Sequence, residues 1–210
     1  MDKQTVLETI GREKLVPVVR TDKREDAQAA IETLAACGIK VFEITMTVPD
    51  AVGLIADLKS ADILIGAGTV LDKDQAEKCI EAGARFIVSP AFDAATVEYC
   101  KAQDVAVMPG SLTPTEVLTV WNAGADCAKV FPCDLLGGAK YLKTLKTLFP
   151  HITMMPTGGV SLDTIADFFR AGAFAVGVGA DLVDVKAIQA GNLDAVAEKA
   201  RKYLEIVKNL

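Results

Sequence analysis

The sequence of 210 residues contains a single histidine, His151, and this scarcity narrows the chemistry open to the chain. One histidine cannot build a multi-histidine metal centre. His151 also directly precedes a predicted strand, which places it at the structural end of a parallel sheet. Asp and Glu residues are not clustered at the spacing of metal ligands. The sequence therefore predicts no metal site and no nucleophile that a histidine activates.

Cysteine pairs and long apolar segments are also missing. The five cysteines are odd in number and form no C-x-x-C pair, a pattern typical of reduced, buried thiols. The first residues are polar, no apolar signal segment follows them, and no apolar run has the length of a membrane span. These features predict a cytoplasmic protein that neither enters nor crosses a membrane.

Positive charge is in short supply, with 22 Lys and Arg residues against 28 Asp and Glu residues and a formal net charge of -6. Such a chain is a poor match for nucleic acid or an anionic membrane, although a small anionic substrate is compatible with a locally positive site. Hydrophobic residues make up 51% of the chain, which excludes disorder. The length and the absence of a linker predict one domain over residues 1–210.

Short apolar runs alternate with amphipathic helical patterns, such as those over 24–36 and 72–81, along the whole chain. Runs that are apolar almost throughout are typical of parallel strands covered by helices on both faces. Eight such runs occur, at residues 15–19, 41–45, 63–66, 85–88, 105–108, 127–130, 152–155 and 174–177. They predict a closed (β/α)8 barrel, with an open doubly wound sheet as the alternative. The first dozen residues predict an extra helix that closes the barrel floor.

A repeated register supports the barrel. Four predicted helices end at a glycine suited to the left-handed position after a helix, and these glycines are Gly38, Gly83, Gly124 and Gly172. Counting five residues onward in each case reaches Glu43, Val88, Lys129 and Gly177. Alternate strands of an eight-stranded barrel supply the side chains of one layer, so we expect Glu43 and Lys129 to meet near the C-terminal mouth.

Lys129 is the most unusual residue, because it lies in an apolar strand where a lysine has no structural purpose. Burial disfavours the charged form of an amine, and the neutral amine is a nucleophile toward carbonyl groups. Glu43, in the apolar run at 41–45, suits a proton shuttle. The alternative is a buried ion pair between the two residues, which is compatible with catalysis.

Glycine-rich segments follow the seventh and eighth predicted strands, at 156–160 and 177–180. In barrels this is a common place for a phosphate, held by backbone N–H groups and a helix N-terminus, and Ser161 is a candidate cap for that helix. A tight turn is the alternative interpretation of each glycine pair. The chain has no Walker A motif, and the segment 66–69 lacks the third glycine of a dinucleotide-binding motif.

Four further residues have individual interpretations, two of them as candidate groups at the mouth. Arg20, at the end of the first strand, suits a carboxylate or phosphate, with a solvated loop cation as the alternative. Thr69, after the third strand, either offers a hydroxyl to the same cavity or caps the next helix. Glu116 completes a capping box with Thr113, so we expect a structural role for it. Cys133 is interpreted as a small packing residue.

These segments together resemble a known family over essentially the whole chain. The segments that carry the resemblance are Val16–Arg20, Phe42–Thr45, Ile65–Leu71, Phe86–Pro90, Met108–Gly110, Thr113–Glu116, Lys129–Pro132 and Pro156–Val160. In order and spacing they are similar to the 2-keto-3-deoxy-6-phosphogluconate / 4-hydroxy-2-oxoglutarate (KDPG/KHG) aldolases. The resemblance implies a class I lyase on a (β/α)8 barrel.

The resemblance also implies roles for individual residues. Lys129 would be the Schiff-base lysine and Glu43 the general acid/base. Substrate contacts would come from Arg20, Thr69, Pro90, Phe131 and Thr157. The phosphate would lie on Gly158, Gly159, Gly179 and Ala180.

The same resemblance implies a homotrimer that needs no metal and no cofactor beyond the lysine imine. The substrate would be a small anionic keto acid that is split into pyruvate and an aldehyde. The phosphorylated sugar acid would give glyceraldehyde 3-phosphate, and 4-hydroxy-2-oxoglutarate would give glyoxylate.

Two departures from the family pattern concern anion binding. Thr47 stands where many members have an arginine, and Ala180 stands where others have a serine. The alternatives are therefore a 2-keto-3-deoxy-6-phosphogalactonate aldolase, an unphosphorylated main substrate, or a phosphosugar isomerase or epimerase on a similar barrel. Two less favoured alternatives are a ligand-binding barrel without catalysis and a structural assembly subunit.

Overall fold

Nine short strands form the centre of the computed structural model, which describes residues 1–210. They are β1 (Leu15–Val19), β2 (Val41–Thr45), β3 (Leu64–Gly68), β4 (Phe86–Val88), β5 (Ala106–Met108), β6 (Gly110–Ser111), β7 (Ala128–Val130), β8 (Met154–Pro156) and β9 (Val176–Val178). One sheet has the strand order β5-β4-β3-β2-β1-β9 and a second has the order β6-β7-β8. All pairings within both sheets are parallel, as the continuous apolar runs predict.

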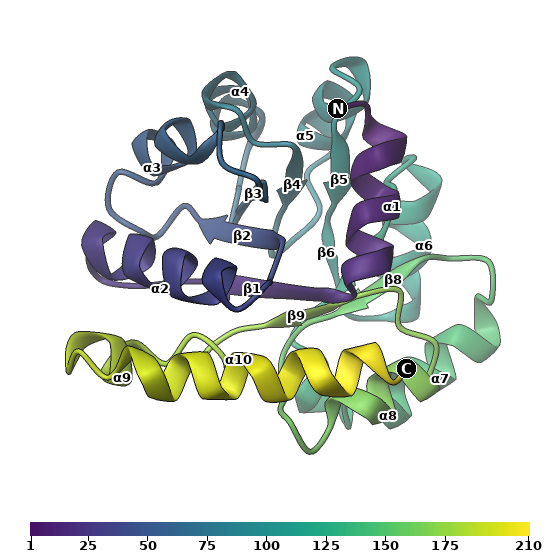
Figure 1. Cartoon of the computed structure of the whole chain (residues 1–210). Coiled ribbons are helices and arrows are strands. Elements are labelled where there is room, and N and C mark those ends of the chain that lie inside the picture. Colours follow the sequence, from purple (N-terminus) through teal and green to yellow (C-terminus); the bar gives the residue numbers. More distant parts are fainter.

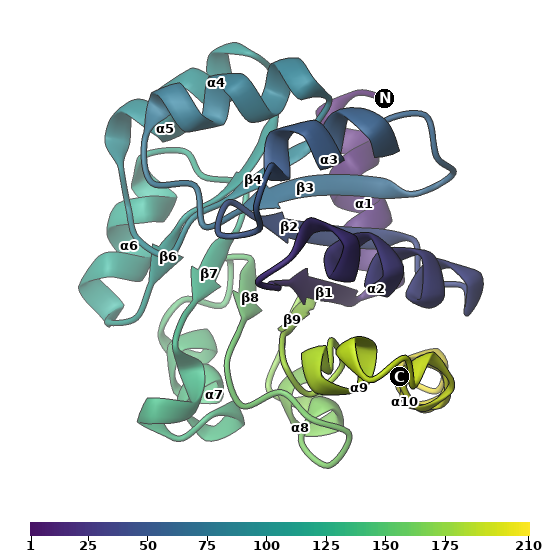
Figure 2. The same cartoon turned by 90° about the vertical axis from the view of Figure 1, so that its left-hand side faces the viewer.

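Ten α-helices and one short 3-10 helix lie outside the curled sheets (Figures 1 and 2). They are α1 (Lys3–Glu13), α2 (Arg24–Ala36), α3 (Ala51–Leu58), α4 (Lys73–Ala82), α5 (Ala94–Ala102), α6 (Pro114–Asn122), η1 (Cys133–Leu136), α7 (Ala139–Leu148), α8 (Ile165–Arg170), α9 (Val185–Gln189) and α10 (Leu193–Lys208). The C-terminal α10 packs beside α2. No helix among them combines the length and the apolar character needed to cross a bilayer.

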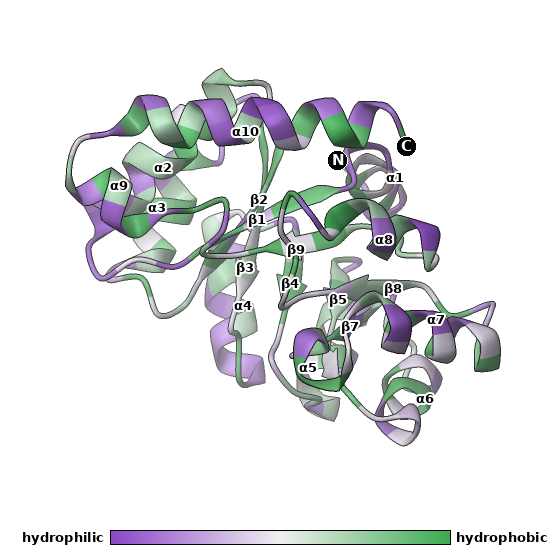
Figure 3. Ribbon diagram, turned by 90° about the horizontal axis from the view of Figure 1, so that it is seen from below, coloured by the Kyte–Doolittle hydropathy of each residue, from purple (hydrophilic) through white to green (hydrophobic).

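Most element bounds agree with the sequence patterns. The strands over 15–19 and 41–45 and the helix over 24–36 match their predictions, and the other predicted strands differ by at most two residues at either end. Every residue of the strands is buried, and Figure 3 shows the strands as largely hydrophobic segments. The sheet is therefore covered on both faces, which is the reason that its strands are apolar throughout.

The two sheets contact each other at two places. β5 and β6 are consecutive in the chain, and only Pro109 separates them; its carbonyl accepts a hydrogen bond of 2.9 Å from the N–H of Lys129. At the other side, Thr157 forms an isolated parallel bridge with Gly177, and the N–H of Phe174 donates to the carbonyl of Met154 at 3.0 Å.

A separate cluster of buried apolar side chains joins α1 to the strands, and most of its members lie in the first half of a strand or just before one. We call this the floor cluster, and its members are Val6, Ile10, Val16, Val41, Leu64, Phe86, Val88, Ala106, Met108, Cys127, Met155 and Ala175. Val6 and Ile10 come from α1, which contacts β1, β2 and β5. The predicted N-terminal helix is thus confirmed, and it packs against the strands. A larger cluster of 46 buried residues lies between the strands and the outer helices.

The predicted helix ends are confirmed, with one exception. The four glycines have left-handed φ angles of +105°, +118°, +87° and +97° at Gly38, Gly83, Gly124 and Gly172. Ser161, however, does not cap the next helix, because α8 begins only at Ile165 with Thr164 at its N-cap. The backbone N–H of Ser161 instead donates to the Thr164 hydroxyl at 2.8 Å, within the turn that precedes the helix.

Candidate active site

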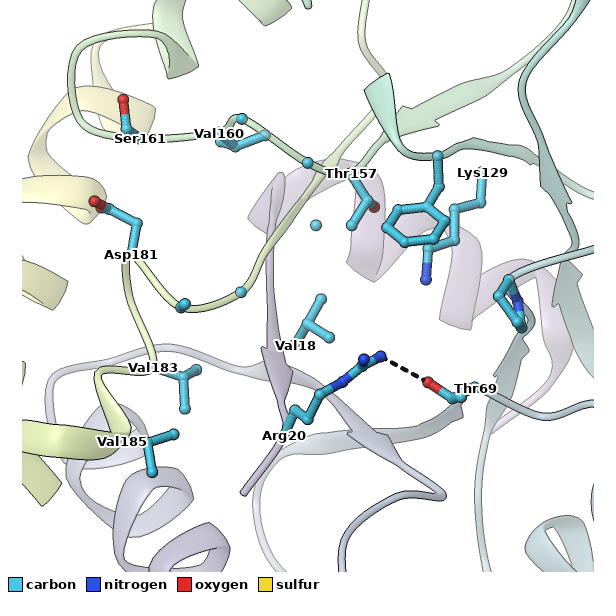
Figure 4. Close-up of a pocket in the computed structure, with 17 residues that line it drawn as sticks. Val18, Arg20, Thr69, Lys129, Thr157, Val160, Ser161, Asp181, Val183 and Val185 are labelled. Carbon is cyan, nitrogen blue, oxygen red and sulfur yellow. Dashed lines mark hydrogen bonds between the residues drawn. The ribbon is translucent and has the colours of Figure 1, made fainter. Parts of the chain in front are cut away.

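A cavity of about 540 Å³ opens at the C-terminal ends of the strands, which we call the mouth (Figure 4). Its wall contains ten of the predicted site residues, namely Arg20, Thr69, Pro90, Lys129, Phe131, Thr157, Gly158, Gly159, Gly179 and Ala180. They come from the ends of β1, β3, β4, β7, β8 and β9 or from the loops that follow. The mouth of a parallel α/β sheet is where side chains from several strand ends converge.

Lys129 in the cavity wall contacts Glu43, as the glycine register predicts, although Glu43 is fully buried and is not itself part of the wall. The Lys129 Nζ lies 3.4 Å from Glu43 Oε1, although the residues are 86 positions apart in the sequence. Their side chains are 6% and 1% exposed. Glu43 Oε2 is buried and has no hydrogen-bond partner in the chain. A buried carboxylate with one free oxygen, beside a buried amine, is suited to accepting and returning protons.

Gly68 explains how the Glu43 carboxylate fits between the strands. β2 and β3 are neighbours in parallel register, with Thr45 opposite Gly68. A Cβ atom at Gly68 would lie only 2.1 Å from Glu43 Oε1. The carboxylate therefore lies against bare backbone, and this position requires glycine.

Thr157 and Phe131 line the cavity on the Lys129 side. The Lys129 Nζ lies 5.3 Å from the centre of the Phe131 ring, within the range of a cation–π contact. The Thr157 hydroxyl is buried without a partner in the chain, so it is free to bond a ligand. A Cβ at Gly177 would lie 2.3 Å from that hydroxyl oxygen, so Gly177 leaves it room.

Arg20 and Thr69 interact across the rim of the mouth. The Arg20 guanidinium donates to the Thr69 hydroxyl at 3.0 Å, as the dashed line in Figure 4 marks. Thr69 has a φ of +57°, an unusual value for a β-branched residue that directs its side chain into the cavity wall. It is not a helix cap, because Asp72 caps α4 by accepting from the Gln75 N–H at 2.8 Å.

The two glycine loops form the other end of the cavity. Gly158 and Gly159 are consecutive left-handed residues, with φ of +100° and +71°. Five backbone N–H groups here donate no hydrogen bond within the chain, those of Gly158, Gly159, Val160, Gly179 and Ala180. Unpaired backbone N–H groups are suited to binding an anion. α8 begins only at Ile165 and has no residue in the cavity wall, whereas Val185, the first residue of α9, lines the cavity together with the loops.

The remaining predictions concern residues outside this chemistry. Burial raises the pKa of the Cys133 thiol to about 11, and its packing role is confirmed by its place in the main core cluster. Glu116 completes the capping box, and the N–H groups of Thr113 and Leu112 hold its pKa below the usual value. His151 packs edge-on against Trp121 and is absent from the cavity wall.

Some features of the mouth differ from the sequence predictions. Val88 belongs to the floor cluster and does not line the cavity. In the sheet it pairs with Met108, another member of that cluster. The cavity wall also includes Asp181, a carboxylate that the sequence predictions do not include. Its place directly after the predicted anion loop is the signal that could have identified it. No group of three or more His, Cys, Asp or Glu side chains is arranged to hold a metal ion.

A buried lysine beside a carboxylate at such a cavity is the arrangement used by the class of enzymes that work through a covalent lysine adduct. The family model described as KDPG and KHG aldolase matches residues 6–199. The chain belongs to this family of carbon–carbon lyases.

Individual relatives agree with this assignment. A 2-dehydro-3-deoxy-phosphogluconate aldolase of Treponema pallidum is 33% identical over 205 residues, which cover 97% of this chain and 98% of that protein. The KHG/KDPG aldolase of Escherichia coli K12 is 30% identical, with 92% of each chain covered. The crystal structure of a Legionella pneumophila KDPG aldolase, with pyruvate captured as a covalent carbinolamine, superposes with a TM-score of 0.85 at 29% identity, covering 93% of this chain and 96% of that one.

Proposed function

We propose that the protein cleaves 2-keto-3-deoxy-6-phosphogluconate into pyruvate and glyceraldehyde 3-phosphate, and 4-hydroxy-2-oxoglutarate into pyruvate and glyoxylate. The observation that carries this proposal is the buried pair of Lys129, in the cavity wall, and Glu43, which lies against it. The reaction proceeds through an imine on Lys129 and needs neither a metal nor another cofactor.

The chemistry follows from the two side chains. The neutral amine of Lys129 adds to the C2 ketone, and the carbinolamine loses water to give a protonated imine. Glu43 removes the C4 hydroxyl proton, the C3–C4 bond breaks, and its electron pair moves into the imine to form an enamine. Glu43 then returns the proton to C3, and water releases pyruvate and the free lysine.

The keto-acid end of the substrate lies between Arg20 and Thr69. The Arg20 guanidinium lies 3.0 Å from the Thr69 hydroxyl, so the two side chains together present several hydrogen-bond donors to one carboxylate. Pro90 and Phe131 form the walls around the reacting carbons, and Thr157 supplies a free hydroxyl.

The phosphoryl end lies on the glycine loops, with contacts from Gly158, Gly159, Gly179 and Ala180. The unpaired N–H groups of both loops support this placement and favour a phosphorylated substrate. Position 47 contributes nothing to this anion site, because Thr47 is absent from the cavity wall. Its hydroxyl is hydrogen-bonded to that of Thr45 at 2.8 Å. The alternative is 2-keto-3-deoxy-6-phosphogalactonate, which differs from the gluconate compound at C4.

We infer further that residues 1–210 form one closed (β/α)8 barrel with α1 as an extra N-terminal helix. β5 and β6 then count as one strand interrupted at Pro109, and the bridge between Thr157 and Gly177 joins the last strands. The contacts between the two sheets support this closure.

The proposed assembly is a homotrimer in the cytoplasm, with no nucleic-acid or membrane partner. Exposed apolar side chains support a contact between copies, and they include Leu71, Phe92, Leu135 and Leu136, which follow β3, β4 and β7, and Leu118 on α6. Five free thiols fit a reducing compartment. Sedimentation equilibrium of the purified protein tests the trimer, and a monomer would contradict it.

Borohydride trapping tests the mechanism directly. With pyruvate present, borohydride should reduce an imine to a stable adduct on Lys129, which peptide mass spectrometry can locate. Lys129→Ala should give no adduct, while Lys140→Ala, a change at an exposed lysine on α7, should keep it. An adduct that persists in Lys129→Ala would overturn the assignment. An isomerase, an epimerase or a non-catalytic binding barrel would show no pyruvate-dependent adduct. If the adduct forms, cleavage rates on the three candidate substrates show which one the enzyme prefers.

A further inference from the structure

Asp181 is the only acidic side chain in the wall of the cavity. It directly follows Gly179 and Ala180, which line the cavity and whose N–H groups are unpaired. A carboxylate near a bound phosphate weakens binding, since like charges a few ångströms apart repel even in a partly aqueous site. A loop built to receive an anion therefore has to keep this carboxylate turned away.

Two residues of α10 hold the Asp181 carboxylate. The Tyr203 hydroxyl donates to Asp181 Oδ2 at 2.6 Å, and the Lys199 ammonium lies 3.8 Å from Asp181 Oδ1. Tyr203 is fully buried, whereas the Asp181 side chain is 36% exposed. Burial, followed by the hydrogen bond to Asp181, raises the pKa of Tyr203, so its hydroxyl keeps the proton that it donates.

The direction of the side chain agrees with these contacts. In Figure 4 the Asp181 carboxylate points away from Lys129 and from the centre of the cavity. In sequence, Tyr203 and Asp181 are separated by 22 positions, so α10 reaches back to a loop at the mouth. A hydrogen bond from a neutral phenol to a carboxylate is short and strong, and its donor has no other acceptor in the chain.

We propose that Tyr203 is a positioning residue for substrate recognition, which ties the Asp181 carboxylate to α10 and keeps its charge away from the phosphoryl end of the substrate. The inference rests on the proposed function and deepens it, because it assigns selectivity for phosphorylated substrates to a residue that does not line the cavity. Lys199 assists by partly neutralising the same carboxylate.

Tyr203→Phe removes the hydroxyl and keeps the buried ring. We expect the KM for 2-keto-3-deoxy-6-phosphogluconate to rise about tenfold, the effect of one additional charge at short range. The kcat should not change, because Lys129 and Glu43 are untouched. The half-saturating concentration of pyruvate in C3 proton exchange, which involves only the keto-acid end, should also stay as in the wild type.

The double variant Tyr203→Phe with Asp181→Asn separates charge from packing. It should bring the KM for the phosphorylated substrate back close to the wild-type value, because the released side chain no longer carries a charge. Tyr141→Phe is the matched control, since it removes the phenol hydrogen bond to the Leu112 carbonyl on another part of the surface. Both kinetic constants should be unaffected in that control.

The outcomes are distinguishable from a failure of the proposed function. A wild-type protein that neither exchanges pyruvate protons nor cleaves the phosphorylated substrate would refute the function itself. An active wild type whose Tyr203→Phe variant shows an unchanged KM, or equal weakening for substrate and pyruvate, would overturn the positioning role. A double variant as weak as Tyr203→Phe would overturn the role of the Asp181 charge.

Discussion

The mouth and the floor of the strand bundle are formed by the same strands but contain different kinds of side chain. The floor cluster is entirely apolar and α1 covers it. Of the eight buried polar or charged residues, seven lie between the middle of a strand and the loop that follows it, on the side of the mouth, namely Thr21, Glu43, Thr45, Ser89, Ser111, Lys129 and Thr157. The remaining one, Thr96, bonds the Asp93 side chain that caps α5.

The contrast shows where stability and chemistry reside in this fold. Burying a polar group without a partner is unfavourable, and both Glu43 Oε2 and the Thr157 hydroxyl are buried in this way. The floor has no such groups and contributes apolar burial alone. We therefore expect changes at the mouth to alter turnover more than stability, and changes at the floor to do the reverse.

Glu43→Gln should have the largest effect among the changes that test this contrast. The amide keeps the size of the side chain but cannot accept the C4 hydroxyl proton, so kcat should fall about 100- to 1000-fold. Steady-state cleavage coupled to pyruvate detection measures the loss, and borohydride should still trap some pyruvate. Glu116→Gln, the same change at a capping residue, should keep full turnover. Wild-type turnover in Glu43→Gln would remove this residue from the mechanism.

Gly68→Ala and Gly66→Ala compare the mouth and the floor cluster within one strand, since Gly68 ends β3 and Gly66 is its central residue. The first places a Cβ 2.1 Å from Glu43 Oε1, and the second places one 2.3 Å from the Phe86 ring in the floor cluster. Gly68→Ala should lower kcat by about 30-fold or more, because displacement of a catalytic group by about 1 Å costs up to about 100-fold.

Gly66→Ala should instead lower the free energy of unfolding by about 1–3 kcal/mol through overpacking, with turnover per folded molecule retained. Urea unfolding and active-site titration by trapping separate the two effects. Equal losses of turnover in both variants would contradict a special role for Gly68.

Ile10→Val tests the floor by itself. Ile10 is fully buried on α1, and removal of one methylene group from such a site lowers the free energy of unfolding by about 1 kcal/mol. Thermal unfolding should shift downward by about 2–4 °C for a chain of this size. The kcat and KM should match the wild type, and a large loss of turnover would show that the floor and the mouth are coupled.

Glu116→Gln should have the smallest effect, about 0.5 kcal/mol of stability at neutral pH, because the cap is exposed to solvent. Folding lowers the carboxyl pKa, so its contribution is complete above the unfolded-state pKa. That contribution is lost as pH falls through the folded-state pKa. Denaturation curves of wild type and variant should therefore converge in acid, and a constant difference down to low pH would contradict this cause.

Much of the site could be predicted because it depends on local signals that repeat along the chain. Gly38 after α2 and Gly124 after α6 lie at the same spacing from Glu43 and Lys129, and this local signal indicated that the two side chains meet. The Asp181–Tyr203 bond and the positive φ of Thr69 could not be predicted in this way. They depend on how a loop packs against a distant helix, for which no periodic pattern exists.

The sequence by itself determined the alternation of strands and helices, the apolar floor and the identity of the unusual lysine. Each of these follows from hydrophobic periodicity and residue type, which act within a few positions of the chain. Only the tertiary structure decided which groups face the cavity and which are held away from it. Parallel strands bring residues 86 positions apart to within 3.4 Å, and side-chain packing across the mouth then sets the direction of each charge.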